Sequence, residues 1–365
     1  MARKILISGG GTGGHIFPAL AIAKELERRD NSTIFLFVGA SNRMEMEKVP
    51  SAGYKIIGLW ISGFQRSLSL KNILFPVKLK MSILKSFFIV LRFKPDVVIG
   101  TGGFASGPVL WIATLFKIPT LIQEQNSYPG ITNKILASRV TKICVAYPGL
   151  ERFFSKEKIQ ITGNPIRSEI EFGNTLKKDS LAAYGFIKEK TTVLVIGGSL
   201  GAKRINETIL ANTIWFKNNN VQLIWQTGNL YYERCKEVQS YLGENVQISA
   251  FISDISKAFS AADIVISRAG AIAISELCSL GKTCILVPSP HVAEDHQKKN
   301  AMALVEKNAA ILVEEKNINA ALFTELDFLI NDPEKQKQLA ENCKKMDQPR
   351  AAQKIVDLVE DLING

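Results

Sequence analysis

Short apolar runs, each typical of a buried β-strand, alternate along the chain with segments in which apolar residues recur at helical spacing. The strands predicted in the first half are Lys4–Ser8, Thr33–Val38, Tyr54–Leu59, Val97–Gly100, Pro119–Gln123 and Lys142–Val145. Those predicted in the second half are Thr192–Ile196, Val221–Gln226, Val246–Ala250, Ile264–Ser267, Thr283–Val287 and Ala310–Val313. Strands separated by helices in this way predict parallel, doubly wound sheets, so the expected fold class is α/β.

The alternation runs through two successive sets of strands, which predicts two Rossmann-like domains. The length of 365 residues agrees, because a single hydrophobic core seldom grows so large. Gly163-Asn164-Pro165 is a turn signal near the midpoint, so we expect the first domain at residues 1–163 and the second at 164–349. A last helical stretch at about 350–363 follows the final strand and can pack back on either domain.

Glycines gather directly after three of the predicted strands, at 9–14, 102–107 and 197–201. A glycine turn that leads into a helix lets the backbone approach a ligand, and the helix N-terminus suits a phosphate or another electron-rich oxygen. Ligands of doubly wound sheets bind beyond the carboxyl ends of the strands. The turns are therefore expected to face one cleft between the domains, with His15 as the titratable side chain of the first turn.

Positive charge is concentrated in the first half of the chain. The formal net charge is +11, and residues 1–163 hold 22 Lys and Arg against 9 Asp and Glu. From residue 48 to residue 95 there are nine basic residues and no acidic one. This imbalance predicts a face that meets an anionic partner, either a membrane surface or a polyphosphate.

The segment Lys71–Lys94 holds 13 Leu, Ile, Val or Phe among its 24 residues, yet spanning a bilayer is unfavourable for it. Each lysine near its middle costs about 2.5–3.5 kcal/mol, which offsets the gain from the apolar side chains. Beyond Pro76, an apolar stripe at helical spacing runs beside a basic stripe: Val77, Met81, Leu84, Phe88 and Leu91, with Lys78, Lys85 and Arg92. This pattern predicts a helix in an anionic membrane interface. The alternative is a helix that covers a sheet with its apolar face in the core, and the two can coexist if that face lies partly in the core.

The histidines and cysteines are not spaced as in a metal site or a disulfide-bonded framework. The three histidines, His15, His291 and His296, have no zinc-binding spacing, so no metal site is expected. The five cysteines are an odd number without a C-x-x-C pair. They indicate buried thiols in a reducing cytoplasm.

Two other classes of protein have to be weighed. Gly9-x-Gly11-x-x-Gly14 fits the dinucleotide fingerprint of an NAD-dependent oxidoreductase, but Phe37-Val38-Gly39-Ala40, at the end of the second strand, lacks the acid that would hold the ribose. A non-catalytic nucleic-acid binder would also carry excess positive charge. Its basic residues should be interleaved with aromatic ones on a reading surface, whereas this basic run is aliphatic and lies beside an apolar stripe. Both classes are kept as alternatives.

The second half contains a better nucleotide site at Ser267–Glu276, where a strand end, a glycine turn and a helix start follow one another. Backbone N–H groups after Gly270 would face a pyrophosphate. The Glu276 carboxylate can accept hydrogen bonds from ribose hydroxyls. A nucleotide is therefore expected on the second domain.

Seven motifs occur in order along nearly the whole chain: Gly10-Gly11-Thr12-Gly13-Gly14-His15, Thr101-Gly102-Gly103, Gln123-Glu124-Gln125-Asn126, Gly163-Asn164-Pro165-x-Arg167, Gly197-Gly198-Ser199-x-Gly201-Ala202, Arg268-x-Gly270-Ala271 with Glu276, and His296-Gln297 with Asn300. As a series they resemble the MurG-type N-acetylglucosaminyltransferases of bacterial cell-wall synthesis. The resemblance implies a two-domain GT-B fold. It also implies transfer of N-acetylglucosamine from UDP-N-acetylglucosamine to the C4 hydroxyl of the muramyl sugar on undecaprenyl-pyrophosphoryl-muramyl-pentapeptide, which converts lipid I to lipid II.

The resemblance further implies where the protein works. It would need no cofactor and would lie as a peripheral protein on the cytoplasmic face of the inner membrane, where the lipid acceptor is held. Lys78, Lys85, Phe88 and Arg92 would then contact the anionic leaflet. Other cell-wall synthesis proteins are candidate partners, and no nucleic acid is expected.

Site residues follow from the matching motifs. The implied donor contacts are Thr12, Gly13, Gly14, Asn126, Arg167, Ser199, Ile252, Ala271, Ile272, Ala273, Ile274, Ser275, Glu276 and Gln297, and the implied contacts of the acceptor pyrophosphate are Gly13, Gly14, Gly102 and Gly103. His15 and Glu276 are the expected catalytic residues. Imidazole can take the proton of an attacking hydroxyl near neutral pH, so we hypothesise that His15 is the general base of an inverting displacement. Leu200 and His296 depart from the glutamines that many relatives carry there.

Overall fold

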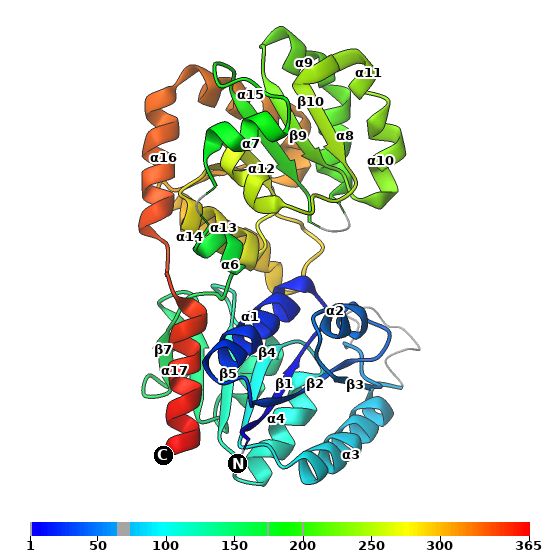
Figure 1. The fold of residues 1–365 in the computed structure, drawn as a ribbon, viewed down its shortest axis with the longest axis vertical. Coiled ribbons are helices and arrows are strands. Elements are labelled where there is room, and N and C mark those ends of the chain that lie inside the picture. The colour runs from blue at the N-terminus through cyan, green and yellow to red at the C-terminus, as the bar shows by residue number, and fades with distance from the viewer. Residues whose placement is uncertain (1, 64–73, 174, 199–200) are drawn as a thin grey trace. The chain divides into compact units, whose positions relative to one another are not determined.

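The structure is a computed structural model that describes residues 2–63, 74–173, 175–198 and 201–365. It contains two compact units, one formed by Met1–Arg167 with Gln348–Gly365 and the other by Ser168–Asp347 (Figure 1). The chain leaves the first unit after Arg167 and returns to it at Gln348. Asn164–Arg167 thus belong to the first unit, whereas the sequence analysis placed them in the second.

The first unit is built on a seven-stranded parallel sheet in the order β3-β2-β1-β4-β5-β6-β7. Its strands are β1 (Lys4–Gly9), β2 (Ile34–Ala40), β3 (Ile56–Leu59), β4 (Val97–Gly102), β5 (Thr120–Glu124), β6 (Lys142–Val145) and β7 (Ile159–Ile161). Six of them lie at the apolar runs that predicted them. The edge strand β7 was missed, because its three residues are not fully buried and form no continuous apolar run.

Helices cover both faces of this sheet (Figure 1). They are α1 (Gly13–Arg29), α2 (Glu45–Ser51), α3 (Phe75–Phe93), α4 (Ser106–Leu115), α5 (Ile131–Leu136), a 3-10 turn (Leu150–Arg152) and α17 (Ala351–Asn364). Successive side chains of a strand point to opposite faces. In β1, Ile5 and Ile7 therefore join one core with α1 and α17, while Leu6 joins the other core with α3 and α4.

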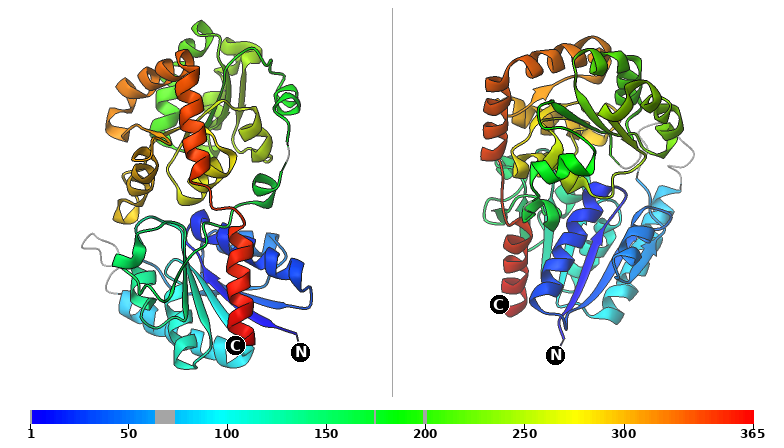
Figure 2. Two further views of the ribbon diagram at one scale, coloured as in Figure 1. Left: turned by 90° about the vertical axis from the view of Figure 1, so that its left-hand side faces the viewer. Right: turned by 45° about the horizontal axis from the view of Figure 1, so that its top comes forward.

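The C-terminal helix α17 is part of the first unit. It packs along α1, as both views of Figure 2 show for the red helix beside the blue one. Ile355, Val356 and Val359 are buried in the core that α1 shares. At the rim of this core Arg29 forms ion pairs with Asp357 (2.7 Å) and Glu360 (2.8 Å).

The second unit is built on a six-stranded parallel sheet in the order β10-β9-β8-β11-β12-β13. Its strands, all at predicted positions, are β8 (Thr192–Ile196), β9 (Gln222–Gln226), β10 (Val246–Ser249), β11 (Ile264–Ser267), β12 (Thr283–Leu286) and β13 (Ile311–Leu312). Its helices are α6 (Ser168–Glu171), α7 (Lys177–Ala183), α8 (Lys203–Ala211), α9 (Thr213–Asn218), α10 (Asn229–Lys236), α11 (Gln239–Leu242), α12 (Ile255–Ala261), α13 (Ala271–Leu280), α14 (His296–Val305), α15 (Ile318–Asn331) and α16 (Pro333–Lys345), with 3-10 turns at Gly243–Asn245, Ala293–Asp295 and Glu315–Asn317.

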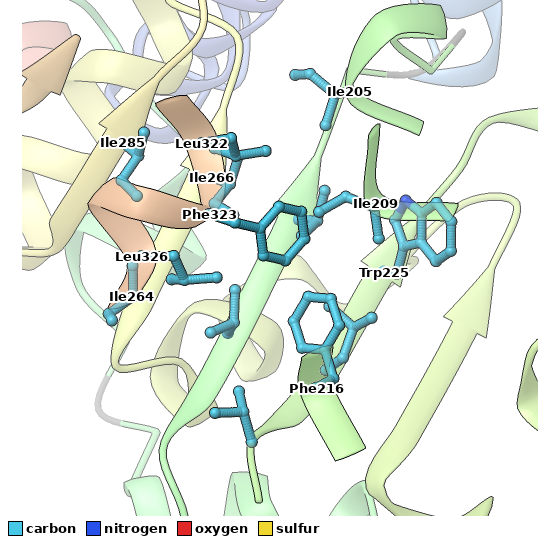
Figure 3. Close-up of a cluster of buried hydrophobic side chains, with 14 of the residues drawn as sticks. Ile205, Ile209, Phe216, Trp225, Ile264, Ile266, Ile285, Leu322, Phe323 and Leu326 are labelled. Carbon is cyan, nitrogen blue, oxygen red and sulfur yellow. The ribbon is translucent and has the colours of Figure 1, made fainter. Parts of the chain in front are cut away.

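Aliphatic side chains fill the core between this second sheet and its helices, with the rings of Phe216, Trp225 and Phe323 among them (Figure 3). The rings of Phe216 and Phe323 meet edge to face, with centroids 5.9 Å apart. Trp225 is fully buried, and its indole N–H donates to Asn206 Oδ1 (3.0 Å), so the one polar atom of the indole is satisfied.

In both sheets the strand order reverses at the first strand: the next two strands in the chain are added on one side of it and the later strands on the other. β1 lies between β2 and β4, and β8 lies between β9 and β11. This is the Rossmann strand order, so the predicted fold class of two doubly wound parallel sheets is confirmed. In such sheets ligands bind beyond the carboxyl ends of the two strands between which the strand order reverses. A ligand is therefore expected at the loops after β1 and β4 in the first unit and after β8 and β11 in the second.

Candidate functional site

The glycine loops after β1 and β4 lie against each other. The Gly10 N–H donates to the Gly102 carbonyl (3.3 Å). Gly103 has a φ of +86°, and a Cβ there would lie 2.2 Å from the Gly10 carbonyl oxygen. Two of the predicted glycine turns are thus brought together in the first unit, and residue 103 must be glycine for the backbones to approach so closely.

His15 lies in the first turn of α1, with its ring between these two loops. Its Nδ1 is 2.8 Å from the Gly10 carbonyl oxygen and 3.3 Å from Thr12 Oγ1. A carbonyl oxygen can only accept a hydrogen bond, so the shorter contact assigns the proton to Nδ1 and leaves Nε2 as the basic nitrogen of the neutral ring. A Cβ at Gly102 would lie 2.9 Å from Cδ2 and 3.1 Å from Nε2, so the absence of a side chain there makes room for the imidazole.

The N-terminus of α1 offers backbone donors beside this ring. The Thr12 carbonyl accepts from the N–H groups of His15 (3.1 Å) and Ile16 (3.2 Å), as the first turn of a helix requires. The N–H groups of Gly13 and Gly14 come earlier in the helix and have no intrahelical acceptor. Together with the positive end of the helix dipole, they suit phosphate oxygens.

A buried carboxylate fixes the loop after β5. Glu124 Oε1 accepts from the backbone N–H and from Nδ2 of Asn126, both at 3.0 Å. Its Oε2 accepts from the Gly130 N–H (3.0 Å) and from Asn133 Nδ2 (2.8 Å). Asn126 is therefore held by Glu124, a role that the sequence motif alone did not assign.

The turn at the end of the first unit is tied to the same loop. Gln123 Nε2 donates to Asn164 Oδ1 (2.8 Å), and Asn164 Nδ2 donates to the Gln125 carbonyl (3.0 Å). Arg167 follows this turn, with its guanidinium carbon 5.9 Å from the centroid of the Phe17 ring on α1. The structure thus places Asn126 and Arg167 in the unit that carries His15.

In the second unit, α13 begins directly after β11, with Gly270 as its N-cap. The predicted donor residues Ala271–Glu276 form its first turns. The side chains of Ile272 and Ile274 are buried, so the groups available to a ligand there are mainly backbone N–H groups. Glu276 is also buried, at 2 % exposure, on the same helix. Ser199 and Leu200, after the neighbouring strand β8, lie outside the described residues.

Glutamine side chains connect the loops of the second unit. Gln226 Oε1 accepts from the Ile252 N–H (2.9 Å), and Gln226 Nε2 donates to the Gly198 carbonyl (2.9 Å). This link was not predicted, and it means that the Ile252 N–H is already used. Gln297 Oε1 accepts from the Ser289 N–H (2.8 Å), which ties the start of α14 to the loop after β12.

A cavity of about 370 Å³ opens in the second unit between charged side chains that include Arg204, Lys298, Glu314, Glu315 and Lys316. Its size suits a small ligand. Hydrogen bonds from Lys298 and Lys316 lower the pKa of Glu314 to about 2, so this carboxylate is ionised. The predicted donor residues that the structure describes are not among those that line the cavity, so it adds nothing to the nucleotide site.

Helix α3 carries its apolar stripe on the outside. Its buried residues are Ser82, Ser86, Ile89 and Val90, while the stripe is 47–57 % exposed and consists of Val77, Met81, Leu84, Phe88 and Leu91. The stripe is therefore not in the core, although α3 does cover the core of this unit through Ile89 and Val90. Lys78 Nζ donates to Ser62 Oγ (3.1 Å) and Lys85 Nζ donates to the Gly58 carbonyl (2.7 Å), whereas Arg92 is exposed.

Three further expectations concern membranes, metals and thiols. Within the described part of the chain, none of the helices has both the length and the hydropathy needed to cross a bilayer. The same residues contain no cluster of three or more His, Cys, Asp or Glu side chains arranged for a metal ion. All five cysteines are buried free thiols, as predicted.

Comparison with known proteins defines the class. Models of the N-terminal and C-terminal domains of glycosyltransferase family 28 match residues 5–145 and 192–355. Together with the two Rossmann sheets, these matches define a glycosyltransferase. The NAD-dependent oxidoreductase and the non-catalytic nucleic-acid binder are therefore set aside.

Similar proteins narrow this class to one family of transferases. The UDP-N-acetylglucosamine--N-acetylmuramyl-(pentapeptide) pyrophosphoryl-undecaprenol N-acetylglucosamine transferase of Flavobacterium psychrophilum is 51% identical over 362 residues, which are 99% of this chain and 98% of that protein. The protein of the same name from Parabacteroides distasonis is 49% identical with the same coverage. The crystal structure of MurG from Acinetobacter baumannii has a TM-score of 0.78 at 27% identity and covers 98% of this chain and 99% of its own. The chain belongs to this family of transferases.

Proposed function

We propose that this glycosyltransferase moves N-acetylglucosamine from UDP-N-acetylglucosamine to the C4 hydroxyl of N-acetylmuramic acid in undecaprenyl-pyrophosphoryl-MurNAc-pentapeptide. Relatives that are about half identical over nearly the whole chain are transferases named for these two substrates, which supports the proposal. The observation that carries the chemistry is the His15 ring, held by the Gly10 carbonyl so that Nε2 is its basic nitrogen.

The first unit is proposed to hold the acceptor pyrophosphate and to share in donor binding, and the second unit is proposed to hold most of the UDP. In the first unit, the N–H groups of Gly13 and Gly14, beside Gly102 and Gly103, would bind the acceptor pyrophosphate. In the second unit, UDP would be bound by Ser199, by groups of Ile252 other than its N–H, by the residues Ala271–Glu276 and by Gln297, with Glu276 accepting from the ribose hydroxyls. The remaining proposed donor contacts belong to the first unit and are Thr12, Gly13, Gly14, Asn126 and Arg167.

In the reaction, the acceptor C4 oxygen attacks C1 of the sugar, the bond from C1 to the UDP oxygen breaks, and the configuration at C1 is inverted. The hydroxyl proton passes to His15 Nε2. The departing UDP gains negative charge, which the N-terminus of α13 can stabilise. One helix dipole contributes about 0.3–1 kcal/mol when exposed and up to ~2 kcal/mol when partly buried, so several hydrogen bonds must act with it.

The test is a transfer assay with radiolabelled UDP-N-acetylglucosamine and a short-chain lipid I analogue. We expect labelled disaccharide lipid only when both substrates are present, and the same rate with and without EDTA. UDP-glucose serves as the control donor. No labelled lipid product with the folded protein would contradict the proposal, and a loss of rate in EDTA would contradict the expectation that no metal is needed.

We also propose that the protein acts as a peripheral enzyme on the cytoplasmic face of the inner membrane, in peptidoglycan synthesis and hence in cell shape and division. The support is helix α3, whose apolar stripe faces outward although Ser82 and Ser86 lie in the core. Such a stripe can enter the acyl boundary while Lys78, Lys85 and Arg92 meet anionic headgroups. Other cell-wall synthesis proteins are proposed partners on the same surface of the membrane.

Flotation with liposomes tests this membrane contact. The wild type should float with vesicles that contain phosphatidylglycerol and much less with pure phosphatidylcholine. Changing Phe88→Asp together with Arg92→Glu is expected to weaken binding at least about tenfold, because each basic residue near an anionic surface contributes about 1 kcal/mol and the aspartate opposes insertion. Phe328→Asp on α15 is the matched control, since it also places a charge at an exposed aromatic position. Equal flotation with both vesicles, or an unchanged double variant, would contradict the contact.

A further inference from the structure

A buried carboxylate lies under the first glycine loop and has no place in the chemistry described so far. Glu45 begins α2, which packs against β2 and β3 (Figure 1), and its side chain is 0 % exposed. Both carboxylate oxygens accept from the Gly11 N–H, at 3.1 and 3.0 Å. Oε1 also accepts from the Ala40 N–H at the end of β2 (2.9 Å). The carboxylate is therefore directed at the loop that leads into α1.

Two glycines make room for this side chain. A Cβ at Gly10 would lie 2.0 Å from Glu45 Oε1, and one at Gly39 would lie 2.5 Å from Glu45 Cγ. These contacts explain two glycines that the turn itself does not require. They also explain the missing acid at the end of the second strand: a carboxylate does reach that place, but it comes from α2 and binds the glycine loop rather than a ribose.

The groups that Glu45 and His15 contact belong to one peptide bond. The Gly11 N–H, which donates to Glu45, and the Gly10 carbonyl, which accepts from His15 Nδ1, are the two polar ends of the Gly10–Gly11 peptide. A carboxylate on the N–H end holds the peptide plane in one orientation and draws electron density toward the carbonyl oxygen. Chains of hydrogen bonds strengthen one another in this way, by perhaps 10–30% per bond.

We infer that Glu45 is a positioning residue for His15, acting through the Gly10–Gly11 peptide. It fixes the carbonyl that selects the Nδ1–H tautomer, so that Nε2 is the nitrogen offered to the acceptor hydroxyl. A carboxylate that orients a catalytic histidine is common, but here a backbone amide stands between the two side chains. The inference rests on the proposed role of His15 as the base.

The test compares Glu45→Gln with wild type in the full chain. Glutamine keeps an acceptor oxygen of the same reach and removes the charge. We expect kcat to fall about tenfold, comparable to the lower end of the effect of hydrogen-bond partners that orient metal-binding histidines, with the KM for UDP-N-acetylglucosamine within about twofold. In 15N-histidine NMR spectra, the wild-type His15 signals should show the Nδ1–H tautomer, and the variant should show a mixture with the Nε2–H tautomer.

Glu47→Gln is the matched control, because Glu47 is on the same helix but exposed, and among the described residues its carboxylate pairs with the neighbouring Lys48 (3.0 Å). It should change neither kcat nor the His15 signals. A Glu45→Gln protein that melts at a lower temperature but keeps its kcat and its His15 spectrum would reduce Glu45 to a structural role and overturn the inference.

Two further results separate this inference from the proposed function. A wild-type spectrum with His15 in the Nε2–H form would overturn the inference even if Glu45→Gln cannot be folded. If alanine at position 15 left turnover intact, the assignment of the base would fail, while the spectra would still show whether Glu45 sets the tautomer.

Discussion

Replacing His15 by alanine is expected to lower turnover by roughly 10²–10⁴, the range that a positioned general base contributes. The reason is geometric: Nδ1 is committed to the Gly10 carbonyl at 2.8 Å, so Nε2 is the one ring nitrogen that can accept the proton of the C4 hydroxyl. UDP is proposed to be held mainly by the second unit. Its affinity, measured by calorimetry, should therefore stay within about twofold of the wild type.

The control for this experiment is His291→Ala, which removes an exposed imidazole from the second unit. It should leave turnover unchanged. If His15→Ala retained more than about a tenth of wild-type turnover, another group would have to take the proton. A parallel loss of UDP affinity would point to a role of His15 in donor binding.

The second large effect is expected for Gly103→Ala. Its φ of +86° is unfavourable for alanine, and its Cβ would meet the Gly10 carbonyl oxygen at 2.2 Å. Gly149 separates the two causes, because it has a φ of +83° but nothing within 4 Å of an added Cβ. Gly149→Ala should therefore cost only the strain of the left-handed conformation, about 1–2 kcal/mol.

Gly103→Ala must in addition displace the loop after β1, so we expect a total loss of at least about 3 kcal/mol. Scanning calorimetry should show a fall in melting temperature of several degrees for Gly149→Ala and at least about twice that fall for Gly103→Ala. Because the Gly10 carbonyl holds His15, turnover should also drop at least tenfold in Gly103→Ala alone. Similar melting temperatures and rates for the two variants would show that the loops do not need this close approach.

The sequence predicted the sheets well because parallel strands are buried on both faces and appear as continuous apolar runs. The short edge strand β7 was missed, since it is not marked by such a run. The ends of several other strands differ from the prediction by one or two residues, as where β1 continues to Gly9, β2 to Ala40 and β4 to Gly102. The glycine turns and His15 could be singled out because a strand followed at once by glycines and a helix is a local signal. The structure brings the turns after β1 and β4 together at His15, whereas the roles of these residues stay predictions.

The supporting carboxylates were not found, because their contacts depend on the fold. Glu45 lies 34 residues beyond Gly11 in sequence, in a short helix without a strong periodic pattern. The sequence marks the position of Glu45 only through Gly10 and Gly39, which leave space for its side chain. That space can be recognised only once β1 and β2 are known to be paired. Glu124 was part of a recognised motif, but the structure was needed to show that its carboxylate holds Asn126 by two hydrogen bonds. The direction of the α3 stripe likewise required the structure, since an amphipathic pattern does not say which face is covered.

The return of α17 to the first unit has a consequence for synthesis on the ribosome. Ile355, Val356 and Val359 complete a core that otherwise consists of residues from the N-terminal part of the chain. The N-terminal sheet emerges first and α1 covers part of this side, but the area under α17 stays uncovered until the C-terminal helix has been translated. The unit made first is thus finished last, and the apolar surface of α1 must be kept from aggregating in the meantime.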